Sequence, residues 1–195
     1  MNQKESFSQI DLSPEKFLHV STAWASNFSN HRDLIQEQIQ KTSTPYVSIS
    51  HCPLLGGVLF SDQSCGLDVE VLDRMQEKIV SRVSTEEEMK QIKRLQLPLG
   101  YLWTAKEASW KATRNICQPK VISSMEIDFT SAKEPHGLKW PLVAVDSAAS
   151  YRAVVLPEDQ MTQPEQKKSI SLHGLCWMQK MANQNEVVVI SVCFL

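Results

Sequence analysis

The first part of the chain has apolar residues near helical spacing. They recur through residues 14–40, and Pro14, which follows Ser13, suits the first turn of a helix. The pattern therefore predicts one or two amphipathic helices over residues 14–40.

From residue 45 the pattern changes to that of β-strands. Three short runs rich in β-branched and apolar residues follow one another, at residues 46–51, 57–60 and 65–70. The last two runs are separated by Ser61-Asp62-Gln63-Ser64, which is rich in turn-forming residues. These two runs are predicted to form a hairpin.

Two helices are predicted next. The run Ser84-Thr85-Glu86-Glu87 has the pattern of a capping box, and basic residues gather before Pro98, as expected near a helix C-terminus. A second helix is predicted from Leu99 to about residue 115.

The remainder of the chain predicts mainly strands. They are expected at residues 121–129, 142–145, 151–156, 172–180 and 186–194, with a polar loop at 157–168 and a turn at 182–185. Strands that follow one another with short connections favour antiparallel pairing, so the fold class expected is α+β with mostly antiparallel sheets packed with helices.

Composition narrows the range of functions. The chain has 195 residues, 42% of them hydrophobic, and a net charge of -2, so it can bury a core and carries no basic field for nucleic acid. Five scattered cysteines without a C-x-x-C pair indicate neither a zinc site nor a disulfide framework. Neither a secretion signal nor an apolar run long enough to span a membrane is evident. We expect a cytoplasmic protein without nucleic-acid or membrane partners.

The strongest chemical signal is a set of acids on two neighbouring predicted elements. Side chains alternate along a strand, so Asp68 and Glu70 share one face of the strand at 65–70. On the second predicted helix, Glu107 and Lys111 lie one turn apart on one stripe, together with Trp103. If helix and strand pack together, three carboxylates and a lysine converge. Carboxylate oxygens are ligands that suit Mg²⁺.

Each half of this set also has an ordinary structural interpretation. Two exposed acids on a strand are common on solvated faces, and a Glu–Lys pair one turn apart is usual on helix surfaces. Trp103 and Trp110 are interpreted as core residues, because the helix needs an apolar face.

Taken together, the two segments resemble the signature of the 4′-phosphopantetheinyl transferase superfamily. The family has a Gly-apolar-Asp-apolar-Glu strand followed by an aromatic-Ser/Thr/Cys-x-Lys-Glu-Ala/Ser-x-x-Lys helix. These elements stand here as Gly66-Leu67-Asp68-Val69-Glu70 and Trp103-Thr104-Ala105-Lys106-Glu107-Ala108-Ser109-Trp110-Lys111. The run Val47-Ser48-Ile49-Ser50-His51 is similar to the family's Ser-His strand, and Ile190-Ser191-Val192-Cys193 looks like one of its last strands. The resemblance implies a holo-acyl-carrier-protein synthase-like fold.

What the resemblance implies about activity is specific. Such an enzyme uses Mg²⁺ to transfer the 4′-phosphopantetheine group of coenzyme A to a serine of an apo-carrier protein, leaving adenosine 3′,5′-bisphosphate. The implied metal ligands are Asp68, Glu70 and Glu107. Glu70 and Glu107 also compete for the role of general base, and Lys111 is the implied ammonium that neutralises the leaving phosphate. The residues considered for coenzyme A binding are Lys41, Ser50, His51, Lys106 and Lys111.

Family members are of two kinds: large pseudodimers of two similar halves, and small single-half subunits that form trimers. Residues 65–195 look like one complete catalytic half, whereas residues 1–64 look too few for a second copy. Because the Ser50-His51 element belongs to the two-half kind, we expect a monomeric pseudodimer with a shortened N-terminal half, residues 1–64. Arg32 and Lys41 are the candidates for binding the coenzyme A 3′-phosphate.

The partner and the alternatives to an enzyme are considered next to the resemblance. The target can be an acyl, peptidyl or aryl carrier protein. Lys90 and Lys93, between the two signature segments, are expected to steer an acidic carrier or to belong to a mixed, solvated surface. The alternatives to the enzyme are a catalytically silent relative that binds coenzyme A or a carrier protein, and an unrelated α+β protein in which the motifs are coincidental.

Overall fold

The computed structural model describes residues 10–11, 20–25, 31–41, 43–114, 116, 118–129, 149–155, 169–181 and 186–195. The described strands form two antiparallel sheets. The predicted strand at residues 142–145, the loop at 157–168 and the turn at 182–185 lie outside the described residues.

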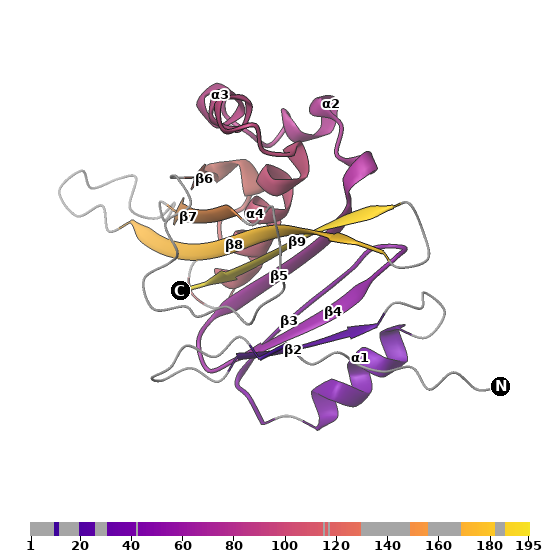
Figure 1. Ribbon diagram of the computed structural model, residues 1–195. Coiled ribbons are helices and arrows are strands. Elements are labelled where there is room, and N and C mark those ends of the chain that lie inside the picture. Colours follow the sequence, from indigo (N-terminus) through magenta and orange to yellow (C-terminus); the bar gives the residue numbers. More distant parts are fainter. Residues whose placement is uncertain are drawn as a thin grey trace.

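The first sheet has four strands in the order β1-β2-β4-β3 (Figure 1). Their bounds are β1 Ile10–Asp11, β2 Val20–Ala25, β3 Tyr46–His51 and β4 Gly56–Ser61. Helix α1, His31–Gln40, packs against β2 and β4. Strands β3 and β4 are consecutive in the chain and pair along their whole length, from Tyr46 opposite Ser61 to His51 opposite Gly56.

The prediction of helices over residues 14–40 is therefore correct only in its second part. Residues Val20–Ala25 form a strand, because they pair with β4 along their full length, from Val20 opposite Ser61 to Ala25 opposite Gly56. Backbone hydrogen bonds to a neighbouring strand override a weak local helical pattern. Residues 14–19 and 26–30 of the same prediction lie outside the described residues.

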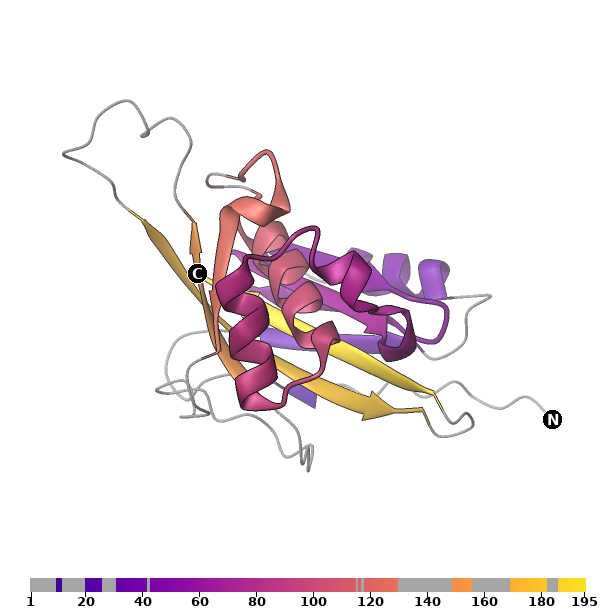
Figure 2. The ribbon, with the colours of Figure 1, turned by 90° about the horizontal axis from the view of Figure 1, so that it is seen from above.

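The second sheet has five strands in the order β5-β9-β8-β7-β6. Their bounds are β5 Cys65–Val71, β6 Met125–Asp128, β7 Ala149–Val155, β8 Ile170–Lys180 and β9 Val187–Phe194. Helices α3 and α4 lie on one face of this sheet (Figure 2). The helical segments are η1 Leu72–Arg74, α2 Glu77–Val80, α3 Glu86–Leu95, α4 Leu99–Ala112 and η2 Ile122–Ser124.

The predicted hairpin between β4 and β5 is wrong. Strand β4 pairs with β2 and β3, whereas β5 pairs with β9 in the other sheet. The free edge of β5 faces β3 instead, and the two are joined through side chains: the backbone N–H groups of Leu67 and Val69 donate to the hydroxyls of Ser48 and Ser50. The turn at Asp62–Ser64 thus leads the chain from the first sheet to the second. The hydroxyls of Ser48 and Ser50 satisfy backbone N–H groups on the edge of β5 that β4 was expected to cover.

Strand β5 has two differently used faces. Leu67 and Val69 are fully buried in a hydrophobic cluster with Leu59 of β4 and Trp177 of β8. The other face is turned to α4, which also contacts β8 and β9 and buries a second, larger cluster around Tyr101. The alternation predicted from the sequence is confirmed, and it places Asp68 on the side of α4.

The fold class predicted from the sequence is confirmed: the protein is α+β, with antiparallel sheets packed against helices. The two sheets divide between Ser61 and Cys65. The interpretation of residues 1–64 and 65–195 as two halves of a pseudodimer stays a prediction. Among the described helices, none combines the length and the apolar character needed to cross a bilayer.

Candidate active site

A glycine allows α4 to approach β5 closely. A Cβ atom on Gly66 would lie 1.8 Å from the carbonyl oxygen of Ala108 and 2.8 Å from the backbone nitrogen of Ala112. The hydroxyl of Ser64, just before β5, donates to the carbonyl of Ala112 at 2.6 Å and fastens the end of the helix. This contact brings the polar stripe of α4 to the carboxylates of β5.

Lys111 and Asp68 form the centre of the site. The Lys111 ammonium donates to Asp68 Oδ1 at 2.8 Å, to the Leu67 carbonyl at 3.0 Å and to Ser50 Oγ at 3.3 Å. Ser50 Oγ in turn donates to the same Asp68 oxygen at 3.0 Å. Residues from β3, β5 and α4, far apart in the sequence, therefore meet around one carboxylate oxygen.

The second oxygen of Asp68 has no such neighbours. Asp68 is only 3% exposed, and its Oδ2 atom is buried without a hydrogen-bond partner among the described residues. A buried carboxylate oxygen without a partner is costly, since it has lost its water and gained nothing in exchange. The orphan oxygen marks a position where a cation would be stabilised.

The neighbouring acids carry an excess of negative charge. Burial, followed by the charge of Asp68, raises the pKa of Glu70 to about 7, and Lys111 and Arg74 oppose this only in part. The same two causes raise the pKa of Glu107, again opposed by Lys111. Three carboxylates thus share one region with fewer cations than would balance them, so a bound cation would lower the electrostatic cost.

The residues present fit Mg²⁺ in chemistry, although they do not form a closed cage. Among the described residues, no three His, Cys, Asp or Glu side chains converge closely enough to hold a metal as they stand. Glu70 and Glu107 nevertheless lie near enough to Asp68 for its charge to raise their pKa values. A set of carboxylate oxygens with one unpartnered member is typical of an open Mg²⁺ site, in which substrate and water complete the coordination.

The other residues expected at the site are placed differently. Ser50 joins the cluster, and His51 follows it at the exposed end of β3. The Lys41 ammonium pairs with Glu37, one turn earlier in its own helical segment, at 2.6 Å. The side chain of Arg32 lies outside the described part of the structure.

Lys106 is not part of the cluster. Its side chain is fully buried, and its ammonium pairs with Glu88 at 2.8 Å and donates to the Met125 carbonyl. Burial lowers the pKa of Lys106, while Glu88 opposes that effect. Because neighbours in a helix point in different directions, Lys106 binds α4 to α3 and β6, whereas Glu107 faces β5. The phosphate contact expected for Lys106 from the sequence is not the contact that the structure gives it.

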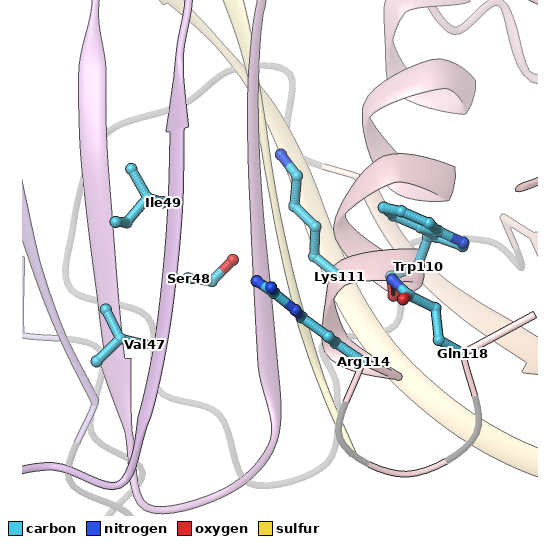
Figure 3. Close-up of a pocket in the computed structure, with 7 residues that line it drawn as sticks. All are labelled: Val47, Ser48, Ile49, Trp110, Lys111, Arg114 and Gln118. Atoms are coloured by element: carbon cyan, nitrogen blue, oxygen red, sulfur yellow. Dashed lines mark hydrogen bonds between the residues drawn. The ribbon is translucent and has the colours of Figure 1, made fainter.

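Two arginines near the site were not recognised as site residues from the sequence. Arg74 follows Glu70 closely and its charge lowers the pKa of that carboxyl. Arg114 comes three residues after Lys111 and lines the same pocket, between β3 and the end of α4 (Figure 3). The helical spacing of Lys111 and Arg114 is the signal that could have indicated it.

The pocket has a volume of about 450 Å³. Val47 and Ile49 of β3 and Trp110 of α4 give it apolar walls, and Lys111 and Arg114 supply the positive charge. The remaining lining residues are Ser48 and Gln118. It is therefore suited to a ligand that has both an apolar part and an anionic part.

Comparison with known proteins agrees with the geometry. No curated protein matches the chain. The family model described as the 4′-phosphopantetheinyl transferase superfamily matches residues 64–159, which include all three carboxylates and Lys111. The match supports a transferase that moves phosphopantetheine in general. The chain belongs to the 4′-phosphopantetheinyl transferase superfamily.

Proposed function

We propose that the protein transfers the 4′-phosphopantetheine group of coenzyme A to a serine of an apo-carrier protein, with Mg²⁺ as cofactor. The observation that carries the proposal is the buried, unpartnered Oδ2 atom of Asp68 beside Glu70, Glu107 and Lys111. A cluster with surplus negative charge and a free carboxylate oxygen suits a cation, and a pyrophosphate is bound through such a cation.

The metal ligands proposed are Asp68, Glu70 and Glu107. When bound, Mg²⁺ would neutralise negative charge on the pyrophosphate of coenzyme A. The chain's own residues prepare this position, since Lys111 and Ser50 fix one oxygen of Asp68 and leave the other available.

The reaction requires a base. The serine oxygen of the carrier forms a bond to the phosphorus of the phosphopantetheine group, and the bond from that phosphorus to the oxygen of adenosine 3′,5′-bisphosphate breaks. The serine proton must pass to a carboxylate, and Glu70, whose pKa is raised in the metal-free protein by burial and by the charge of Asp68, is the first candidate. Glu107 also has a raised pKa and is the second candidate.

The two substrates are proposed to meet in the space bordered by β3, β5 and α4. Ser50 and His51 stand at the end of β3 and are proposed to contact coenzyme A phosphates. Ser50, whose hydroxyl donates to Asp68, and Lys41, paired with Glu37, would have to leave those partners to do so. The protein is proposed to act as a monomer in the cytoplasm, on an acyl, peptidyl or aryl carrier.

Intact-protein mass spectrometry tests the proposal. Apo-carriers of the three classes are incubated with the protein, coenzyme A and Mg²⁺, beside an Asp68→Asn variant of the same shape. A gain of about 340 Da, the mass of one phosphopantetheine arm, is expected only with the unchanged protein. If no carrier gains mass while coenzyme A still binds, the protein is a catalytically silent relative. Absence of both transfer and binding contradicts the proposal.

A further inference from the structure

The side chain of Tyr151 in β7 crosses the neighbouring strand β8 and reaches β9. A Cβ atom on Gly174, the direct partner of Tyr151 in β8, would lie 2.1 Å from Cζ of the tyrosine ring and 2.4 Å from the phenol oxygen. The ring therefore occupies the space of the side chain that Gly174 lacks. The phenol oxygen lies 3.0 Å from the hydroxyl oxygen of Ser191 in β9. Tyr151 and Ser191 are 3% and 0% exposed, so this polar contact is formed in the interior.

The buried phenol is satisfied by groups of the protein. It can donate to the Val192 carbonyl at 3.3 Å while it accepts from Ser191, whose oxygen also accepts from the Cys176 thiol at 3.3 Å. Burial raises the pKa of Tyr151 well above its ordinary value, and hydrogen bonding with Ser191 and Ser109 opposes this only in part. Buried polar groups that satisfy one another hold one arrangement, because a shift would leave some of them unpaired.

Ser191 links Tyr151 to the central carboxylate of the candidate active site. It lies directly opposite Asp68 in the antiparallel pairing of β9 with β5. Directly opposite residues project from the same face of a sheet, with Cβ atoms about 5 Å apart. For this pair it is the face turned to α4. A displaced Ser191 would therefore disturb the packing around Asp68.

Ser109 links the same cluster to the helix that carries Glu107 and Lys111. It is fully buried, and its hydroxyl lies 3.3 Å from the Cys193 thiol of β9. Ser109 is two residues from both Glu107 and Lys111, and two residues correspond to about 200° of rotation around a helix, so it lies on the opposite side of α4. The contacts of Ser109 with the sheet thus fix how α4 is rotated, and this rotation determines where Glu107 and Lys111 point.

Resting on the function proposed above, we propose that Tyr151 is a positioning residue for the transfer reaction. Its phenol holds Ser191 of β9 and Ser109 of α4 around one buried hydroxyl, and thereby fixes Asp68 relative to the polar stripe of α4. Because Tyr151 is buried, it acts through these neighbours and not on a substrate. Without the hydroxyl, helix and sheet keep their apolar packing but gain freedom to shift against each other. Such a shift slows the chemical step more than it weakens substrate binding, since reacting groups need the closer alignment.

The test is steady-state kinetics of carrier modification by Tyr151→Phe, which removes the hydroxyl and keeps the ring that packs on Phe129. We expect kcat to fall about 10-fold, with the KM values for coenzyme A and for carrier protein within about 2-fold of those of the unchanged protein. Calorimetric binding of Mg²⁺ to the substrate-free protein should weaken as well, because groups behind a metal ligand orient it. Normal Mg²⁺ affinity would overturn the link to Asp68.

Two variants separate positioning from loss of stability. Tyr46→Phe is the matched control, because it removes the same group from a half-buried tyrosine at the start of β3, and its kcat should be normal. Val155→Ala, fully buried at the end of β7 and outside the cluster, should lower the urea midpoint without changing kcat. If Val155→Ala lowers kcat as much as Tyr151→Phe does, the effect is one of stability and the inference is overturned.

Ser109→Ala removes the hydroxyl on the helix side, and it takes the place of Tyr151→Phe should that variant not fold. It should lower kcat in the same way, and the double variant should lose no more than the larger single loss. Additive losses would overturn the shared cluster. Normal kcat in both single variants overturns the inference while leaving the proposed function intact. Failure of the unchanged protein to modify any carrier overturns the proposed function on which the inference rests.

Discussion

The carbonyl oxygen of Ala108 occupies the space that a side chain on Gly66 would need, 1.8 Å from the position of its Cβ atom. The obstacle is backbone and belongs to the middle of α4, so it cannot rotate away as a side chain could. The glycine of the Gly-apolar-Asp-apolar-Glu strand therefore determines how near the helix comes to Asp68.

Gly66→Ala is expected to separate α4 from β5 and to impair both stability and the site. Overpacking of this kind costs about 1–3 kcal/mol of unfolding free energy, and the displaced Lys111 would release Asp68. Urea unfolding and the carrier mass assay measure the two effects. Gly100→Ala is a suitable comparison within the same helix, because its Cβ would meet a side-chain atom, Cγ2 of the buried Val189, at 2.9 Å instead of backbone at 1.8 Å, and it should cost less stability. If Gly66→Ala behaves like Gly100→Ala, the close approach is not needed.

Glu70→Gln is expected to stabilise the metal-free protein at alkaline pH while reducing activity. The pKa of Glu70 is raised from 4.5 to about 7, so the folded protein holds this proton more tightly than the unfolded chain does. The free energy of unfolding therefore falls as the pH rises from 4.5 to 7, and the cost is fully present above 7. A glutamine carries no charge at either pH. Glu70→Gln should therefore raise the free energy of unfolding by about 1–2 kcal/mol at pH 8 and by close to zero at pH 4.5.

Urea unfolding in chelator at the two pH values measures this gain. Glu186→Gln, on an exposed residue before β9, should show no comparable change between them. Addition of Mg²⁺ should reduce the advantage of Glu70→Gln, because the cation neutralises the same charge. If the free energies of unfolding of Glu70→Gln and the unchanged protein differed by the same amount at both pH values, the raised pKa of Glu70 would be contradicted.

Lys106→Met is expected to destabilise the protein without affecting coenzyme A binding. It would leave Glu88, 6% exposed, buried without its cation, and breaking one half of such a pair costs about 3–5 kcal/mol. Glu88 also accepts from the N–H groups of Thr85 and Ile127, so Glu88→Gln alone should be destabilising too. The variant with both Lys106→Met and Glu88→Gln should lose less unfolding free energy than the sum of the two single losses. A double-mutant cycle measured by urea unfolding tests this expectation.

The same variant tests the role expected for Lys106 from the sequence. Below its unfolding temperature, Lys106→Met should keep the coenzyme A affinity of the unchanged protein, because the ammonium faces Glu88 and Met125. If folded Lys106→Met bound coenzyme A more weakly than the unchanged protein does, the phosphate contact expected from the sequence would be supported instead.

Charge reversal on α3 is expected to weaken the carrier interaction. Lys90 and Lys93 form exposed ion pairs with Glu86 and Glu77 at 2.9 and 3.2 Å, and such pairs bind their partners weakly. Their ammonium groups thus remain available to an acidic carrier. Lys90→Glu with Lys93→Glu should raise the KM for carrier protein about 3-fold or more at low ionic strength. Lys180→Glu, at the end of β8, is the control, and an unchanged KM in the double variant would refute steering.

Local features of the chain were predictable where neighbouring residues decide them. A capping box was predicted at Ser84–Glu87, and one forms one residue later, between Thr85 and Glu88. Helix α4 begins at Leu99 as expected. The alternation along β5 correctly separates Asp68 from Leu67, because side-chain direction in a strand follows from covalent geometry.

The sequence by itself determined the α+β class, most of the element positions, the family and the two faces that carry Asp68, Glu107 and Lys111, since all of these depend on short-range spacing. Only the tertiary structure decided that β2 is a strand and that β5 pairs with β9 instead of β4. It also decided that Lys106 pairs with Glu88 and that Arg114 lines a pocket together with Lys111. Each of these depends on a partner far away in the chain. Strand pairing and the choice of an ionic partner depend on which segments the packed core brings together, and that information is absent from any local window of sequence.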